Sequence, residues 1–217
     1  MTDVWSGRAD AYRTAVEQRE GGDLDRIVEW CVDAGAATAL DVATGGGHVA
    51  RRLHEAGLSV TTLDPAPGMR PDVVSGAESI PFADGCFDAV VTRIAPHHFS
   101  DVPAAVREMA RVSCALVIVE DTLYASEEVE EAERLRDPTH LRSYTEDEWR
   151  RFLGAEGLDV EAVELFEKRH PLDAWLARTG CEGDEADRVR ELLADRTDGD
   201  EYVDTKILLR ARKGASS

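Results

Sequence analysis

A glycine-rich segment carries the first chemistry that the sequence suggests. Residues 38–47 read TALDVATGGG, a short apolar run that ends in a glycine cluster. Glycines permit a tight turn and let the backbone come close to a ligand, and a helix that starts there adds unpaired N–H groups. Such a loop after a first strand is typical of nucleotide binding. The loop alone leaves the ligand open, because Gly45, Gly47 and Ala50 also fit the relaxed fingerprint of dinucleotide-binding proteins.

Two aspartates favour S-adenosylmethionine over a dinucleotide. Asp41 ends the first predicted strand at the mouth of the loop, where a carboxylate repels a pyrophosphate and attracts ammonium and sulfonium charges. Asp64 ends the second predicted strand, where a carboxylate can accept hydrogen bonds from both ribose hydroxyls. The alternative for Asp41 is a turn or a helix cap. For Asp64, which precedes Pro65, the alternative is a turn.

Further polar side chains are expected at the same edge of the sheet. His97 and His98 follow the fourth predicted strand, and Asp121 ends the fifth. A histidine with a pKa near neutral can take a proton from a hydroxyl, an amine or an acidic carbon, so His97 is the candidate catalytic base. The candidates for substrate contacts are His98, Asp121, His140 and Tyr12. The alternatives are a helix cap or polar niche for His98, a loop-bracing hydrogen bond for His140 and a surface helix for Tyr12.

The elements that position these residues alternate between strands and helices. Strands are predicted at 38–43, 59–63, 72–75, 87–92 and 114–119, and helices at 23–34, 47–56 and 101–112. The first helix has an apolar stripe that includes Leu24, Ile27 and Cys31, with Asp23 as its N-cap. The fifth strand, CALVIV, is apolar throughout, as expected for a strand covered on both faces. This alternation predicts an α/β fold with a doubly wound, parallel sheet.

The last third of the chain has a different pattern. Thr145 and Glu148 form a capping box that opens a helix at 145–155. A strand at 158–166, helical stretches at 171–179 and 184–195 and a closing strand at 202–211 follow. We expect residues 1–217 to form a single domain, with an N-terminal helical lid at 1–22 and a helical insertion at 170–200 that covers the active site.

Three motifs in order resemble one family. DVATGGG, LDPAPGM and AESIPFADGCFDAVVTR look like the class I S-adenosylmethionine-dependent methyltransferases, in the branch similar to quinone-biosynthesis methyltransferases. The segments IAPHHFSDVPAAVREMARV and DPTHLRSYTEDEW resemble a subgroup of small cytosolic methyltransferases without an assigned substrate. The resemblance implies a Rossmann-like, doubly wound sheet of seven mostly parallel strands with an antiparallel last strand, plus helical cover elements.

The resemblance also implies which residues bind the cofactor. They are Asp41, Ala43, Thr44, Gly45, Gly46, Asp64, Pro65, Met69, Ala77, Glu78, Arg93 and Ile94. Asp41 and the loop backbone would hold the methionine part, Asp64 the ribose, and the residues from Pro65 to Glu78 the adenine. Arg93 and Ile94 would line the methyl region. The sequence departs from the pattern at Gly76, where many relatives have an aspartate for the adenine amino group.

Composition restricts the partners. The net charge of −19 argues against a nucleic-acid substrate, because such a surface repels phosphates. This acidity is typical of a halophilic source, with the steering of a cationic ligand as the alternative. No apolar run could span a membrane, and residues 1–13 have no apolar core behind a basic stretch as a secretory signal would, so we expect a cytoplasmic protein. The four cysteines are far apart, which predicts buried thiols and no metal site.

The leading hypothesis is therefore a methyltransferase that converts S-adenosyl-L-methionine to S-adenosyl-L-homocysteine. Its acceptor would be a small molecule with an O, N or C nucleophile. A nicotinamide-dependent Rossmann oxidoreductase and a non-catalytic S-adenosylmethionine-binding protein are the alternatives. The sequence leaves a homodimer open.

Overall fold

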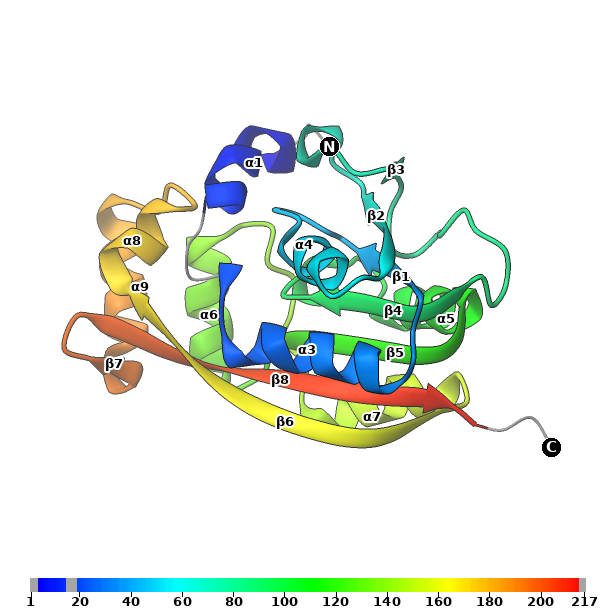
Figure 1. Ribbon diagram of the computed structural model, residues 1–217. Helices are drawn as coiled ribbons and strands as arrows, with labels where there is room; N and C mark the ends of the chain where they lie inside the picture. The colour runs from blue at the N-terminus through cyan, green and yellow to red at the C-terminus, as the bar shows by residue number, and fades with distance from the viewer. Residues whose placement is uncertain (1–3, 15–18, 215–217) are drawn as a thin grey trace.

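A twisted sheet with helices on both faces forms the body of the molecule (Figure 1). The computed structural model describes residues 4–14 and 19–214. The strands are β1 Thr38–Val42, β2 Ser59–Asp64, β3 Val73–Val74, β4 Phe87–Arg93, β5 Ser113–Thr122, β6 Leu158–Pro171, β7 Thr197–Asp198 and β8 Glu201–Lys213. The α-helices are α1 Val4–Thr14, α3 Gly22–Asp33, α4 His48–Glu55, α5 Val102–Val112, α6 Glu127–Arg136, α7 Glu146–Ala155, α8 Leu172–Ala177 and α9 Gly183–Leu192. Short 3-10 helices lie at η1 Pro67–Met69, η2 Pro96–His98 and η3 Ala194–Arg196.

The order of the strands confirms the predicted fold class. Seven strands follow the order β3-β2-β1-β4-β5-β8-β6, and the two-residue β7 pairs with β8 as an eighth strand. The pairs formed among β1 to β5 are parallel, whereas β8 runs antiparallel to both β5 and β6. The carboxyl ends of the parallel strands therefore meet at one edge of the sheet, as a doubly wound fold requires.

Two hydrophobic layers cover the sheet. Along β5, Val117 and Val119 belong to the layer that contains α5 and α7, whereas Leu116 and Ile118 belong to the layer that contains α3 and α4. This alternation explains why the strand is apolar throughout, since both faces are buried. The predicted capping box of α7 is present, and Trp149 of the same helix is 1% exposed.

A third hydrophobic cluster lies at the end of the molecule where α8, α9 and β7 gather (Figure 1, left). It joins α6, α8 and α9 to the start of β8, through side chains such as Val129, Trp175, Val189 and Tyr202. The predicted strand at 158–166 continues to Pro171, because β6 pairs with β8 over its whole length. Helix α6, EEVEEAERLR, was not predicted, because few of its residues are apolar and it is buried through contact with α9.

Two further expectations concern the cysteines and membrane-spanning segments. Cys31 and Cys181 are buried as predicted, but Cys86 and Cys114 are exposed, and all four are free thiols. Within the described ranges, none of the helices combines the length and the apolar character that crossing a membrane requires.

Candidate functional site

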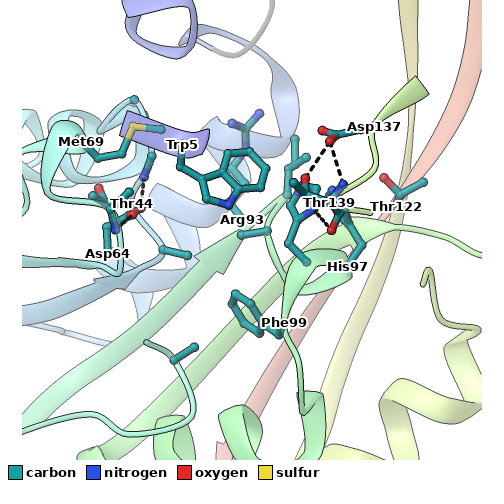
Figure 2. Close-up of a pocket in the computed structure, with 18 of the residues that line it drawn as sticks. Trp5, Thr44, Asp64, Met69, Arg93, His97, Phe99, Thr122, Asp137 and Thr139 are labelled. Atoms are coloured by element: carbon teal, nitrogen blue, oxygen red, sulfur yellow. Dashed lines mark hydrogen bonds between the residues drawn. The ribbon is translucent and has the colours of Figure 1, made fainter. Parts of the chain in front are cut away.

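A cavity of about 760 Å³ lies at the carboxyl ends of the parallel strands. We call one part of it the glycine-loop end, lined by Asp41, Ala43, Thr44, Gly45, Gly46, Asp64, Pro65, Met69, Gly76, Ala77 and Glu78. The other part is the helical end, lined by Thr122, Glu133, Arg136, Asp137, Thr139, Lys168, His170, Trp175, Arg178, Asp204 and Lys206. Figure 2 shows Trp5 between the two, with Met69 and Asp64 on one side and His97 and Thr139 on the other.

The β1–α4 loop has the conformation that its glycines predicted. Gly45 and Gly47 have φ values of 51° and 74°, and Ala43 has φ 56°. This left-handed backbone is unusual for alanine and is the conformation that glycine adopts without steric cost. Asp41 accepts hydrogen bonds from Thr44 Oγ1 at 2.6 Å and Ala50 N at 3.1 Å. Burial raises the pKa of Asp41 to about 7.

Asp64 connects two loops. Its Oδ2 accepts a hydrogen bond from Gly45 N at 3.0 Å, and its Oδ1 accepts one from Ala66 N at 2.9 Å. The bond from Ala66 N is the turn role that was the alternative for Asp64. The carboxylate also lines the cavity. One residue therefore fixes the turn after β2 and presents negative charge to the glycine-loop end.

The predicted adenine residues lie together at this end. Pro65, Met69 and Ala77 supply apolar wall, and Gly76 lines the cavity without a side chain. Glu78 Oε1 accepts hydrogen bonds from the backbone N and the Oγ of Ser100, at 3.0 and 2.9 Å. The carboxylate of Glu78 is thus already bonded to the segment after η2.

A buried ion-pair network lies at the end of β4. Arg93 Nε is 2.8 Å from Glu120 Oε2, and Arg93 Nη2 is 2.5 Å from Asp23 Oδ2. Lys168 Nζ is 2.5 Å from Asp23 Oδ1. Burial would raise the pKa of Asp23, but the two cations outweigh it and hold that pKa well below its usual range. The prediction of Asp23 as an N-cap was wrong, because its partners are distant in sequence and the cap position of α3 is Gly21.

Ile94 follows this network and lines the cavity, as Arg93 does. Its φ of 50° is rare for a β-branched residue, and its N–H donates to Glu120 O at 2.8 Å. Backbone strain of this kind persists where the surrounding structure over-determines it, and it clusters at functional sites. No pattern in the sequence indicated the strain.

His97 lies in η2 and lines the cavity while only 8% exposed. Its Nδ1 is 2.5 Å from Oδ1 of Asp121. Burial lowers the pKa of His97 well below its usual value, so the ring is uncharged at neutral pH. The expectation that Asp121 contacts a substrate was wrong. Its side chain is fully buried behind His97 and does not line the cavity, because the histidine ring covers it.

The other predicted substrate residues differ in position. His98 lines the cavity, and its Nδ1 lies 2.9 Å from Thr139 O. His140 does not line the cavity; its Nε2 lies 3.2 Å from Glu130 Oε2, the loop-bracing alternative, because the chain turns it into the interior. The side chain of Tyr12 lies outside the described residues.

Helix α1 lines the cavity through Val4 and Trp5, and Trp5 lies between the two ends (Figure 2). At the glycine-loop end, Gly68 N donates to Ser6 Oγ at 2.6 Å, and a β-carbon at Gly68 would collide with Ser6. At the helical end, Arg8 Nη1 donates to both carboxylate oxygens of Asp137 at 3.1 Å. The ring of Trp5 lies 4.6 Å from the ring of His98. Helix α1 therefore contacts both ends.

Sequence reasoning did not identify most of the residues at the helical end. Lys206 Nζ donates to Thr122 Oγ1 and Asp204 Oδ2, each at 2.7 Å. The Arg136 guanidinium lies 3.9 Å from the ring centre of Trp175, and its Nε donates to Trp175 O at 3.2 Å. One signal was available, because two of the three lysines, Lys168 and Lys206, are found here.

Across residues 4–14 and 19–214, side chains of His, Cys, Asp and Glu do not gather in a group of three that could hold a metal ion.

Comparison with known proteins adds independent information. A family model described as a methyltransferase domain matches residues 40–115. The uncharacterized methyltransferase YcgJ of Bacillus subtilis is 30% identical over 214 residues, which covers 87% of this chain and 82% of YcgJ. A demethylmenaquinone methyltransferase of Thermotoga maritima is 33% identical over 99 residues, 40% of this chain and 43% of that protein.

Solved structures agree with the sequence relatives. The crystal structure of YcgJ superposes with a TM-score of 0.78 at 25% identity and covers 89% of this chain and 99% of YcgJ. A Bacillus halodurans structure gives a TM-score of 0.77 at 25% identity, over 90% of this chain and 100% of that one. These relatives decide between the two cofactors that the glycine loop alone left open.

Proposed function

The chain belongs to the class I S-adenosylmethionine-dependent methyltransferases, and we propose that it methylates a small molecule held at the helical end of its cavity. The cavity is continuous from the β1–α4 loop to α6 and α8, so that one space can take both a cofactor and an acceptor. The proposal rests chiefly on His97, which lines the cavity next to the helical end (Figure 2) and is oriented by a buried carboxylate.

The glycine-loop end suits the cofactor. When bound, S-adenosylmethionine supplies a methyl group on a sulfonium sulfur. We assign the ammonium group to Asp41 and the loop backbone, and the ribose hydroxyls to Asp64. Asp64 lines the cavity at the end of β2, where a carboxylate can accept hydrogen bonds from ribose hydroxyls. Pro65, Met69 and Ala77 would enclose the adenine with apolar surface.

Glu78 has a modified role in this proposal. Because its Oε1 is bonded to Ser100, the carboxylate holds the segment after η2 in place as well as facing the adenine region. With Gly76 in place of an acid, recognition of the adenine edge falls to Glu78 and to backbone groups.

His97 is proposed as the general base. In the tautomer with the proton on Nδ1, His97 donates to the Asp121 carboxylate and Nε2 is the proton acceptor. The carboxylate would then stabilise the imidazolium that forms. His97 takes the proton that the acceptor loses as its nucleophile bonds to the methyl carbon and the carbon–sulfur bond breaks. Asp121 therefore acts as a positioning residue for His97.

Two assays test this function. Isothermal titration should show that S-adenosylhomocysteine binds and that NADH does not. Incubation with methyl-labelled cofactor and a panel of small metabolites should then label at least one acceptor. Tight binding without labelling of any acceptor would instead support a non-catalytic binding protein.

The proposal also includes the cellular location of the protein and the salt concentration around it. We propose a cytoplasmic protein from a salt-rich interior that avoids nucleic acids, because the net charge of −19 repels phosphates and is tolerated where salt screens it. Thermal melts in dilute buffer and in molar KCl test this, and a melting temperature that does not depend on salt would contradict it. Sedimentation in the same buffers tests for the homodimer.

A further inference from the structure

The two ends of the cavity differ in charge. The charged side chains of the glycine-loop end are all acidic: Asp41, Asp64 and Glu78. The helical end contains four basic side chains, Arg136, Lys168, Arg178 and Lys206, beside three acidic ones, Glu133, Asp137 and Asp204. In a chain with 25 basic and 44 acidic residues, this is a local concentration of positive charge. Asp137 is already paired with Arg8, and Lys168 with Asp23, so the proposal rests on Arg136 and Lys206.

Arg136 is held in a fixed orientation. Its guanidinium stacks on Trp175 at 3.9 Å, Nε donates to Trp175 O, and Nη1 donates to Glu133 at 3.2 Å. The N–H groups on Nη2 have no hydrogen-bond partner among the described residues. A planar guanidinium whose orientation is fixed binds carboxylates and phosphates well, because little conformational entropy remains to be lost.

Lys206 is a second buried donor. It is 5% exposed and uses two hydrogen bonds, to Thr122 and Asp204, of the three that an ammonium group can donate. An acceptor molecule that is wholly apolar would bury these charged groups without giving them new partners, which costs free energy. An anionic group would instead supply the missing acceptors.

We propose that the methyl acceptor is a small anion whose carboxylate or phosphate group binds Arg136 and Lys206 at the helical end. This rests on the proposed function, because it assigns the acceptor to that end. The anion is an anchor distinct from the nucleophile, which lies toward His97.

The anchor also affects His97. Burial is the main cause of the low pKa of His97, and the positive charges of Lys206 and Arg136 lower it further. An anion bound to these two cations offsets their effect and favours the protonated imidazole. Binding of the correct acceptor thus makes His97 a stronger base at the time when it must take a proton.

The test uses fluorinated probes and the whole protein saturated with S-adenosylhomocysteine. Binding is followed by ¹⁹F NMR for 4-fluorobenzoate, 4-fluorophenyl phosphate and the neutral 4-fluorobenzamide. We expect at least one anion to bind at least about fivefold more tightly than the amide. The better anion identifies the anchor as a carboxylate or a phosphate.

Variants identify the site. Arg136→Gln should weaken the anion about tenfold or more, and Arg136→Lys, which keeps the charge without the planar fork, should weaken it less. Arg188→Gln, an equal change of charge at an exposed site on α9, is the control and should leave anion binding unchanged. The double variant Lys206→Met with Asp204→Asn removes a buried pair together and should also weaken the anion.

Failure of the proposed function and failure of the anionic acceptor give different results. If S-adenosylhomocysteine fails to bind before any probe is added, the proposed function is at fault. If it binds, and the amide binds as well as both anions, the anionic acceptor is refuted. Anion binding that survives Arg136→Gln within twofold, in a variant that keeps its affinity for S-adenosylhomocysteine, refutes the assignment as well.

Discussion

The two ends of the cavity are built in different ways. At the glycine-loop end, each acid accepts at least one hydrogen bond from a backbone N–H group, as Asp64 does from Gly45 N and Ala66 N. At the helical end, side chains from α6, α8, β5 and β8 hold one another, as Lys206 holds Thr122 across 84 positions. The backbone-built end suits a ligand that a whole family shares. The side-chain-built end can change with the acceptor while the fold stays the same.

Helix α1 contacts both ends of the cavity. Ser6 is bonded to Gly68 at the glycine-loop end, and Arg8 to Asp137 at the helical end. Trp5 lies between them (Figure 2). Changes at either end should therefore affect that end first and the other only through α1.

The largest expected effect separates chemistry from cofactor binding. His97→Ala should lower the turnover number roughly 10²- to 10⁴-fold, the usual contribution of a general base. The affinity for S-adenosylhomocysteine should stay within about twofold, because His97 lies outside the glycine-loop end. Initial rates with labelled cofactor and calorimetry measure the two quantities. The control is His54→Gln, because His54 is an exposed histidine in α4. Full activity of the His97→Ala variant would show that His97 is not the base.

The next effect should fall on the glycine-loop end. Asp64→Ala removes charged hydrogen bonds and should weaken S-adenosylhomocysteine by about 1.5–3 kcal/mol, or about 10- to 150-fold. Calorimetry measures the loss, and Asp184→Asn, an exposed acid at the start of α9, provides the comparison. An unchanged dissociation constant would be incompatible with a ribose contact.

A smaller effect should appear with pH. Burial raises the pKa of Asp41 to about 7, so this carboxyl is mostly protonated at pH 6 and mostly ionised at pH 8. The ammonium group of the ligand prefers the ionised carboxylate. The affinity for S-adenosylhomocysteine should therefore rise with pH over this range, by up to about tenfold. Asp41→Asn should bind weakly with no such rise, and an equally steep rise in that variant would rule out Asp41 as the titrating group.

The smallest effect concerns the connection between the ends. Arg8→Gln breaks a partly buried ion pair with Asp137, which contributes about 0.2–1 kcal/mol. Backbone hydrogen exchange in α1 should become up to about fivefold faster, whereas exchange in α5 should not change. Arg26→Gln, which breaks a more exposed pair with Glu29, is the control. If the backbone amides of α1 exchange at the same rate in both variants, the ion pair between Arg8 and Asp137 does not stabilise α1.

Sequence reasoning identified the glycine-loop end because its parts are contiguous. Asp41 and the glycines lie in one loop, and Asp64 follows the next strand, so a one-dimensional pattern places them at one edge of a parallel sheet. The same reasoning placed His97 in the cavity but misjudged Asp121, because strand position alone does not say which side chain covers another.

The sequence by itself determined the alternation of strands and helices from α3 to β5, the doubly wound sheet and the cofactor loop. Each of these follows from local rules: hydrophobic periodicity, glycine conformation and the position of a residue at a strand end. Only the tertiary structure decided the helical end, the burial of Asp23 beside Arg93 and Lys168, and the strained backbone of Ile94. These depend on contacts between segments far apart in the chain, such as β4 with β5, β6 with β8 and α6 with α9.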